Sequence, residues 1–174
     1  MAPSNNLVKV HVSKENMSFS AAHFIATKGF REKLHGHNYR LEVSITAQMI
    51  QGGSVVDTRE IKTISQTICN DLHRSFLVPM NSDTLTISLG SKNVRIVTED
   101  LATFSFPKAD CSFLPIVHTS AEELAIYTSN RLVDTITLAA LLERGVQKVV
   151  VSISEADQQF ASYERIILMD MRKS

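Results

Sequence analysis

The segment YRLEVSITAQM, residues 39–49, alternates apolar and polar side chains along its whole length. A period of two places alternate side chains on opposite faces of a strand, so this segment predicts a long, half-buried β-strand. The same alternation occurs in residues 8–12 and 17–23, and His23 falls on the apolar side of the latter segment. The N-terminal part of the chain is therefore predicted to be mainly sheet.

Two helices are predicted after this sheet. The first begins at Asp57, a plausible N-cap that is followed three residues later by a glutamate, and its apolar stripe continues to Leu72. The second begins near Thr119 or Ser120, again with acidic residues in its first turn, and ends before Gly145.

The remaining segments complete one domain over residues 1–174. Gly52-Gly53 breaks the chain after the long strand, residues 83–117 are predicted to form a β-rich insert, and two strands follow at 149–155 and 163–169. This order predicts an α+β fold, a four-stranded antiparallel sheet with two helices on one face. The long edges of such a sheet invite pairing between subunits, so we expect an oligomer.

The amino-acid composition and net charge of the chain disfavour some classes of function. The chain has 174 residues, 44% of them hydrophobic, and a formal net charge of zero, which does not favour nucleic acid or an anionic membrane as a partner. We read no signal peptide in the first ten residues and no apolar run of membrane-spanning length. Cys69 and Cys111 match no metal or redox motif and are expected to be reduced thiols in a cytoplasmic protein.

The most informative motif is LHGHNY, residues 34–39, at the start of the long strand. In an extended segment His35 and His37 point to the same side, and Gly36 between them offers no obstacle. His23 can join them if residues 24–34 connect adjacent strands. Three ligands with a fourth position open are typical of a catalytic zinc site, although imidazoles also bind other divalent ions.

FSAAH (residues 19–23), LHGHNY (34–39) and VVD (55–57) together resemble the 6-pyruvoyl-tetrahydropterin synthase family over nearly the whole chain. The resemblance implies a tunnelling fold in which trimers close a barrel and stack into a homohexamer. It also implies Zn2+ and a small-molecule pterin triphosphate substrate, 7,8-dihydroneopterin triphosphate, from which a lyase removes triphosphate in tetrahydrobiopterin or folate biosynthesis.

The resemblance further implies that Glu155 anchors the pterin ring. A carboxylate can accept two parallel hydrogen bonds from a 2-aminopyrimidinone edge. The alternative for Glu155 is a surface glutamate at a strand end. Ser120 and Glu122 fall where the family has other substrate-binding contacts, and helix capping is the alternative role for both.

The chain departs from the family before the HxH pair, where a catalytic cysteine is usual. Here Glu32 resembles the proton acceptor of a subgroup that forms 6-hydroxymethyl-7,8-dihydropterin instead of 6-pyruvoyl-tetrahydropterin. The alternative for Glu32 is a solvated loop acid between Arg31 and Lys33.

A second departure follows the first helix, where the family has an Asp-His pair and this chain has His73-Arg74. Arginine cannot exchange protons near neutral pH. Either His73 supplies the proton relay, with Asp71 close enough to orient it, or the relay is lost. In the second case the protein is a catalytically impaired pterin-binding or regulatory protein of the same fold.

Overall fold

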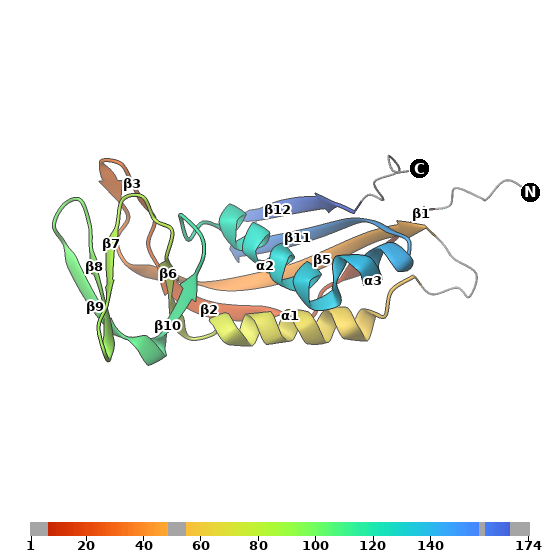
Figure 1. The fold of residues 1–174 in the computed structure, drawn as a ribbon, viewed down its shortest axis with the longest axis horizontal. Helices are drawn as coiled ribbons and strands as arrows, with labels where there is room; N and C mark the ends of the chain where they lie inside the picture. The colour runs from red at the N-terminus through yellow and green to blue at the C-terminus, as the bar shows by residue number, and fades with distance from the viewer. Residues whose placement is uncertain (1–6, 49–54, 157–158, 168–174) are drawn as a thin grey trace, which may run out of the picture.

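The computed structural model describes residues 7–48, 55–156 and 159–167. Its main layer is a seven-stranded sheet in the order β10-β6-β2-β5-β11-β12, with β1 also paired to β5 (Figure 1). The strands of this sheet are β1 (Leu7–Val12), β2 (Ser18–His23), β5 (His35–Gln48), β6 (Ser75–Pro79), β10 (Cys111–Leu114), β11 (Val146–Ala156) and β12 (Gln159–Ile166).

Strand β5 is the long strand predicted from the alternating segment, and it begins four residues earlier than the alternation. β1 pairs with its C-terminal half and β2 with its N-terminal half, so both early strands run along the same edge of β5. The register sets His23 opposite His35. The N-terminal sheet prediction is confirmed for the described residues, and Met49 lies outside them.

The prediction of a four-stranded, wholly antiparallel sheet is wrong. β6 and β10 extend the sheet beyond β2, and both run parallel to it. β6 follows α1 directly and runs in the same direction as β2, with which it pairs at Ala21 and Ala22. β6 is a short run of buried apolar residues, which periodicity alone does not distinguish from other buried segments.

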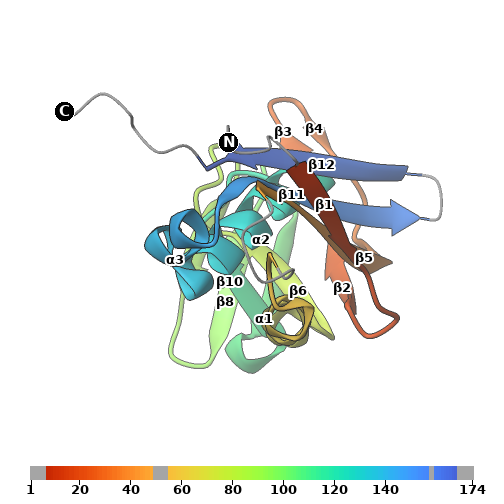
Figure 2. The ribbon, with the colours of Figure 1, turned by 90° about the vertical axis from the view of Figure 1, so that its right-hand side faces the viewer.

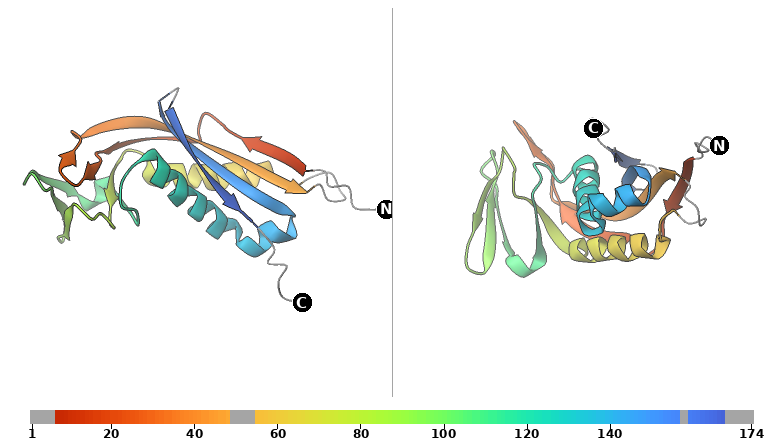
Figure 3. Two further views of the ribbon diagram at one scale, coloured as in Figure 1. Left: turned by 90° about the horizontal axis from the view of Figure 1, so that it is seen from above. Right: turned by 45° about the vertical axis from the view of Figure 1, so that its right-hand side comes forward.

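Helices α1 (Thr58–Leu72), α2 (Ala121–Ile136) and α3 (Leu138–Glu143) lie against one face of the sheet (Figure 3). Asp57 caps α1 and Ser120 caps α2, as the sequence predicts. The single helix expected from residue 120 to Gly145 is two helices, so the prediction of two helices in total is also wrong. Thr137 has a φ of 77°, which ends α2, and its side chain caps α3 by accepting a hydrogen bond from the Ala140 N–H.

The β-rich insert predicted over residues 83–117 is confirmed in part: a separate three-stranded sheet is present, but residues 111–114 of that range belong to the main sheet as β10. The separate sheet consists of β7 (Thr86–Leu89), β8 (Asn93–Val97) and β9 (Thr103–Pro107), followed by a short 3-10 turn at Lys108–Asp110. A two-stranded hairpin, β3 (Ala26–Thr27) and β4 (Phe30–Arg31), which Figure 2 labels, lies at the same end of the molecule (Figure 1).

Two hydrophobic cores result from this arrangement. The larger lies between the main sheet and the helices, and the smaller joins the insert to the residues just after β2. Within the described ranges no helix is long and apolar enough to cross a membrane. The predicted break at Gly52-Gly53 and the last predicted strand residue, Met169, fall outside those ranges.

Candidate metal and pterin site

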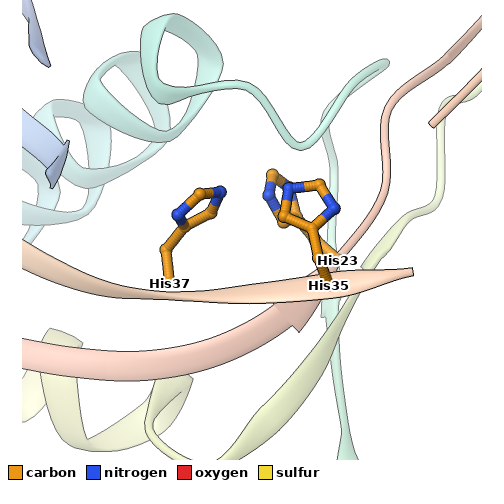
Figure 4. A group of neighbouring side chains, drawn as sticks. All are labelled: His23, His35 and His37. Carbon is orange, nitrogen blue, oxygen red and sulfur yellow. The ribbon is translucent and has the colours of Figure 1, made fainter. Parts of the chain in front are cut away.

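Three histidine side chains meet on the helix-facing side of the sheet (Figure 4). His23 ends β2, while His35 and His37 lie two residues apart near the start of β5. The antiparallel register brings the two strands together here, and the ring centroids are 4.7 Å apart for His23 and His35, 5.2 Å for His23 and His37, and 4.8 Å for His35 and His37. The predicted convergence of the three residues is thus present in the structure.

The buried ring of His23 is held in one tautomer. Its Nδ1 donates to the backbone oxygen of Thr119 at 2.9 Å, because a carbonyl oxygen can only accept. Nε2 is then unprotonated, and it is buried with no hydrogen-bond partner among the described residues. Burial, reinforced by His35, lowers the pKa of His23 to about 4, so this ring is neutral at physiological pH.

His35 is oriented in the same way by its own loop. Its Nδ1 donates to the Lys33 backbone oxygen at 2.7 Å, which leaves Nε2 free to face the other rings. Such outer hydrogen bonds fix the tautomer of metal-binding histidines. The carboxylate of Glu32 lies 4.0 Å from His35 Nε2 and accepts a hydrogen bond from the Ile25 N–H at 3.0 Å.

These features fit a bound divalent metal. One nitrogen from each histidine lies within 4.8 Å of the others, and no other group of three metal-binding side chains of this kind occurs in the part of the chain that is described. Around zinc with bonds of about 2.1 Å, such nitrogens would be about 3.4 Å apart, which small ring rotations can reach. A buried nitrogen without a partner is costly unless something binds it.

Glu155, near the end of β11, lies within electrostatic range of this cluster. Burial raises the pKa of its carboxyl; His37 opposes this shift and Glu122 reinforces it. Glu122 is exposed in the first turn of α2, so the two predicted pterin-binding glutamates lie near each other. Ser120 is engaged as the N-cap of α2, with its hydroxyl accepting from the Glu123 N–H, which is the capping alternative considered for it.

The other two predicted catalytic residues make their contacts elsewhere. His73 follows α1, and its Nδ1 accepts a hydrogen bond from the Ser20 N–H at 3.1 Å. The carboxylate of Asp71 binds the Arg131 guanidinium at 2.8 Å rather than His73. Within one chain, Glu32 is therefore the predicted acid–base residue that lies beside the histidines.

Two residues of the site were not predicted from the sequence. Thr119 was considered only as a possible helix start, yet it fixes the His23 ring. Tyr39 is fully buried with its ring centroid 5.7 Å from that of His37, and burial raises the pKa of its hydroxyl. Tyr39 continues the i, i+2 alternation of His35 and His37, so the sequence pattern already places its side chain on the strand face that carries the two histidines.

The protein has an α+β fold. Its histidine triad lies on two sheet strands, beside a helix N-terminus and several carboxylates, and is a candidate site for a metal and a ligand. A family model described as 6-pyruvoyl tetrahydropterin synthase matches residues 11–166. Because this match covers most of the chain, the protein belongs to the 6-pyruvoyl tetrahydropterin synthase family.

Solved structures agree with this assignment. The 6-pyruvoyl tetrahydropterin synthase of Plasmodium vivax matches with a TM-score of 0.90 and 38% sequence identity, covering 92% of this chain and 99% of that one. The Plasmodium falciparum protein gives a TM-score of 0.90 at 36% identity over 93% of this chain and 99% of that one.

A Methanocaldococcus jannaschii protein described as a 6-carboxy-5,6,7,8-tetrahydropterin synthase is 30% identical over 152 residues, which are 87% of this chain and 91% of that protein.

Proposed function

We propose that the protein is a cytoplasmic, zinc-dependent lyase that acts on 7,8-dihydroneopterin triphosphate, with Glu32 as the proton acceptor and 6-hydroxymethyl-7,8-dihydropterin as the product. The observation that carries this proposal is the position of the Glu32 carboxylate, 4.0 Å from Nε2 of His35, where the family's usual cysteine is absent. We further propose the homohexamer of stacked trimers that the family resemblance implies.

The histidine triad would hold the metal through its three free nitrogens. Zn2+, when bound, would supply Lewis-acid polarisation of oxygens on the substrate side chain. The neutral state of His23 and the hydrogen bonds of His23 and His35 keep these nitrogens available for a metal.

Glu32 is placed for proton transfer at that point. Its carboxylate is one-third exposed, is held by the Ile25 N–H, and can accept a proton from a substrate side chain that lies against the triad. Structures of the Plasmodium vivax enzyme include variants in which a glutamate described as a catalytic residue is replaced by alanine or cysteine. Glu32 is our candidate for the equivalent role here.

Glu155 would bind the pterin ring. Its half-buried carboxylate can accept two parallel N–H hydrogen bonds from the ring edge, and an aromatic heterocycle with two donors would offset the cost of its burial. Glu122 is the proposed second contact, and Ser120 contributes by starting α2 at this point.

The test is incubation of zinc-loaded protein with 7,8-dihydroneopterin triphosphate, with and without a chelator, followed by separation of the pterins. We expect chelator-sensitive 6-hydroxymethyl-7,8-dihydropterin, and Glu32→Gln should lower kcat by about 100-fold or more while zinc is retained. Formation of 6-pyruvoyl-tetrahydropterin would instead place the protein with the cysteine-containing members.

Two observations favour second candidates. The similarity to the Methanocaldococcus jannaschii protein described as a 6-carboxy-5,6,7,8-tetrahydropterin synthase supports a 6-carboxy product. The separation of Asp71 from His73 supports the pterin-binding or regulatory alternative. Full zinc content and pterin binding without any product would select that alternative.

A further inference from the structure

The Glu32 carboxylate is carried by a hairpin too small to hold it alone. β3 and β4 contain two residues each, and a short isolated hairpin is marginal in water. The pairing continues by one step at Ile25 and Glu32, where the Glu32 N–H donates to the Ile25 oxygen at 2.9 Å and the Glu32 carboxylate accepts from the Ile25 N–H. The position of this carboxylate thus depends on what supports the hairpin.

The β-rich insert packs against the base of the hairpin. Phe24 and Ala26 are buried in the smaller core together with Val94 and Ile96 of β8. The Phe24 ring lies 4.8 Å from that of Phe104 on β9, centroid to centroid. Phe24 directly follows the metal-site residue His23, so this core fixes the chain from its last β2 residue into the hairpin.

Polar contacts hold the far end of the hairpin to the turn between β8 and β9. The Gly29 N–H donates to the Glu99 carboxylate at 2.7 Å, from a backbone with a φ of 76° that favours glycine. On the inner side the Thr84 hydroxyl donates to the Ala26 oxygen at 3.0 Å. The insert therefore contacts both β3 and the turn of the hairpin.

Arg31 is the link between this turn and Glu32. Its Nε and Nη2 donate to the two carboxylate oxygens of Asp100 at 3.3 and 3.0 Å, and its Nη1 donates to the backbone oxygen of Glu32 at 3.0 Å. Its guanidinium also lies 5.5 Å from the Phe104 ring centroid. A planar guanidinium bound at both carboxylate oxygens has little rotational freedom.

Asp100 is itself oriented by the insert. The Thr98 hydroxyl donates to one of its oxygens, and the hydrogen bonds from Arg31 and Thr98 hold the pKa of this carboxyl below its usual range. Asp100 therefore remains charged throughout the physiological range. The Asp100 side chain is half exposed, so its ion pair with Arg31 contributes little to the free energy of unfolding. The main effect of this pair is on the local geometry of the hairpin.

We propose that the β-rich insert is a platform that positions the proposed proton acceptor, and that Asp100, acting through Arg31, is the positioning residue that sets the Glu32 carboxylate against the histidine triad. This inference rests on the proposed function of Glu32. The Arg31 guanidinium is bound to Asp100 and is therefore not free to bind a substrate phosphate.

The test compares Asp100→Asn with wild type in steady-state kinetics, zinc content and hydrogen exchange. We expect kcat to fall by about 10- to 100-fold, because small displacements of a reacting group cost about this much. KM and zinc content should be unchanged, and hydrogen exchange should become faster in residues 24–34 only. Arg31→Lys, which keeps the charge but loses the two-point contact, should behave in the same way, and Asp100→Glu should restore part of the activity.

A double variant separates positioning from other effects. In a Glu32→Gln background, Asp100→Asn should lower kcat no further, because its effect passes through Glu32. Glu60→Gln is the matched control: it breaks a similar Arg–carboxylate pair with Arg144, remote in sequence from the hairpin, and should leave kcat and exchange in residues 24–34 unchanged.

The outcomes distinguish this inference from the proposed function. If Glu32→Gln is inactive but Asp100→Asn and Arg31→Lys keep full kcat, the platform role is overturned and the function of Glu32 stands. Multiplicative losses in the double variant, or loss of zinc in Asp100→Asn, would also overturn positioning through Glu32. Wild-type protein without activity, or a fully active Glu32→Gln variant, would overturn both.

Discussion

The Nδ1 atom of His23 donates a hydrogen bond to the backbone oxygen of Thr119, 96 residues later in the chain. Thr119 immediately precedes the N-cap of α2, whose first turn carries Glu122. The loop is fixed in turn by Glu123, which accepts hydrogen bonds from the Val117 and His118 N–H groups. The candidate metal site and the proposed pterin-binding helix therefore share one rigid connection.

Replacement of a single triad histidine should remove the metal. We expect His23→Ala, His35→Ala and His37→Ala each to weaken zinc binding by at least about 100-fold, since even loss of an outer partner of a metal ligand costs 10- to 100-fold. Zinc content after dialysis measures this directly. His11→Ala is the control, because that ring binds Ser44 on the outer side of the sheet. Stoichiometric zinc in all three variants would contradict the site.

The metal-free protein should lose stability as the pH falls below neutrality. The pKa of His23 is about 4 in the folded protein and near 6.5 when unfolded, so between these values the unfolded chain binds the extra proton. Folding stability therefore decreases from pH 6.5 to pH 4, by about 2 kcal/mol between pH 7 and pH 5. Urea unfolding at both pH values measures the loss.

The control for this pH effect is a histidine with a different environment. His23→Gln should flatten the dependence, whereas His11→Gln, whose ring is half exposed, should keep the wild-type slope. Equal slopes in wild type and His23→Gln would show that another group titrates.

Local periodicity predicted the elements that place the triad. Residues 39–49 alternate because one face of β5 is buried, and the same rule put His35 and His37 on one side. Caps at Asp57 and Ser120 were readable because short polar side chains satisfy free N–H groups at helix starts. These features depend on residues close together in the sequence.

Features that depend on distant residues were not predictable in this way. The parallel pairing of β6 with β2 joins segments more than fifty residues apart in the sequence, and the hydrogen bond between His23 and Thr119 joins residues 96 positions apart. Thr137 ends α2 without a glycine or proline signal. The pairing of Arg31 with Asp100 likewise requires the insert to lie beside the hairpin, and no local sequence pattern predicts that arrangement.

Glu155→Gln should weaken pterin binding without affecting the metal. A charged acceptor contributes about 1.5–3 kcal/mol through its hydrogen bonds, which corresponds to about 10- to 100-fold in Kd. Fluorescence titration with neopterin measures the affinity, and zinc content should remain stoichiometric. Glu164→Gln is the matched control, since Glu164 on β12 is exposed and pairs with Lys148. Unchanged neopterin affinity would remove Glu155 from the site.

His73→Gln decides between the two interpretations of the segment after α1. Because Nδ1 of His73 accepts from the Ser20 N–H, the neutral ring carries its hydrogen on Nε2 and can donate a hydrogen bond from that atom. If His73 is the second acid–base group, its replacement should lower kcat by about 100-fold or more with zinc and pterin binding retained. We expect this loss, measured by product formation under saturating substrate, with His11→Gln as the control. A kcat within about threefold of wild type would instead mean that proton transfer proceeds through Glu32 without a histidine relay, because general acid–base catalysis contributes far more than that when it is present.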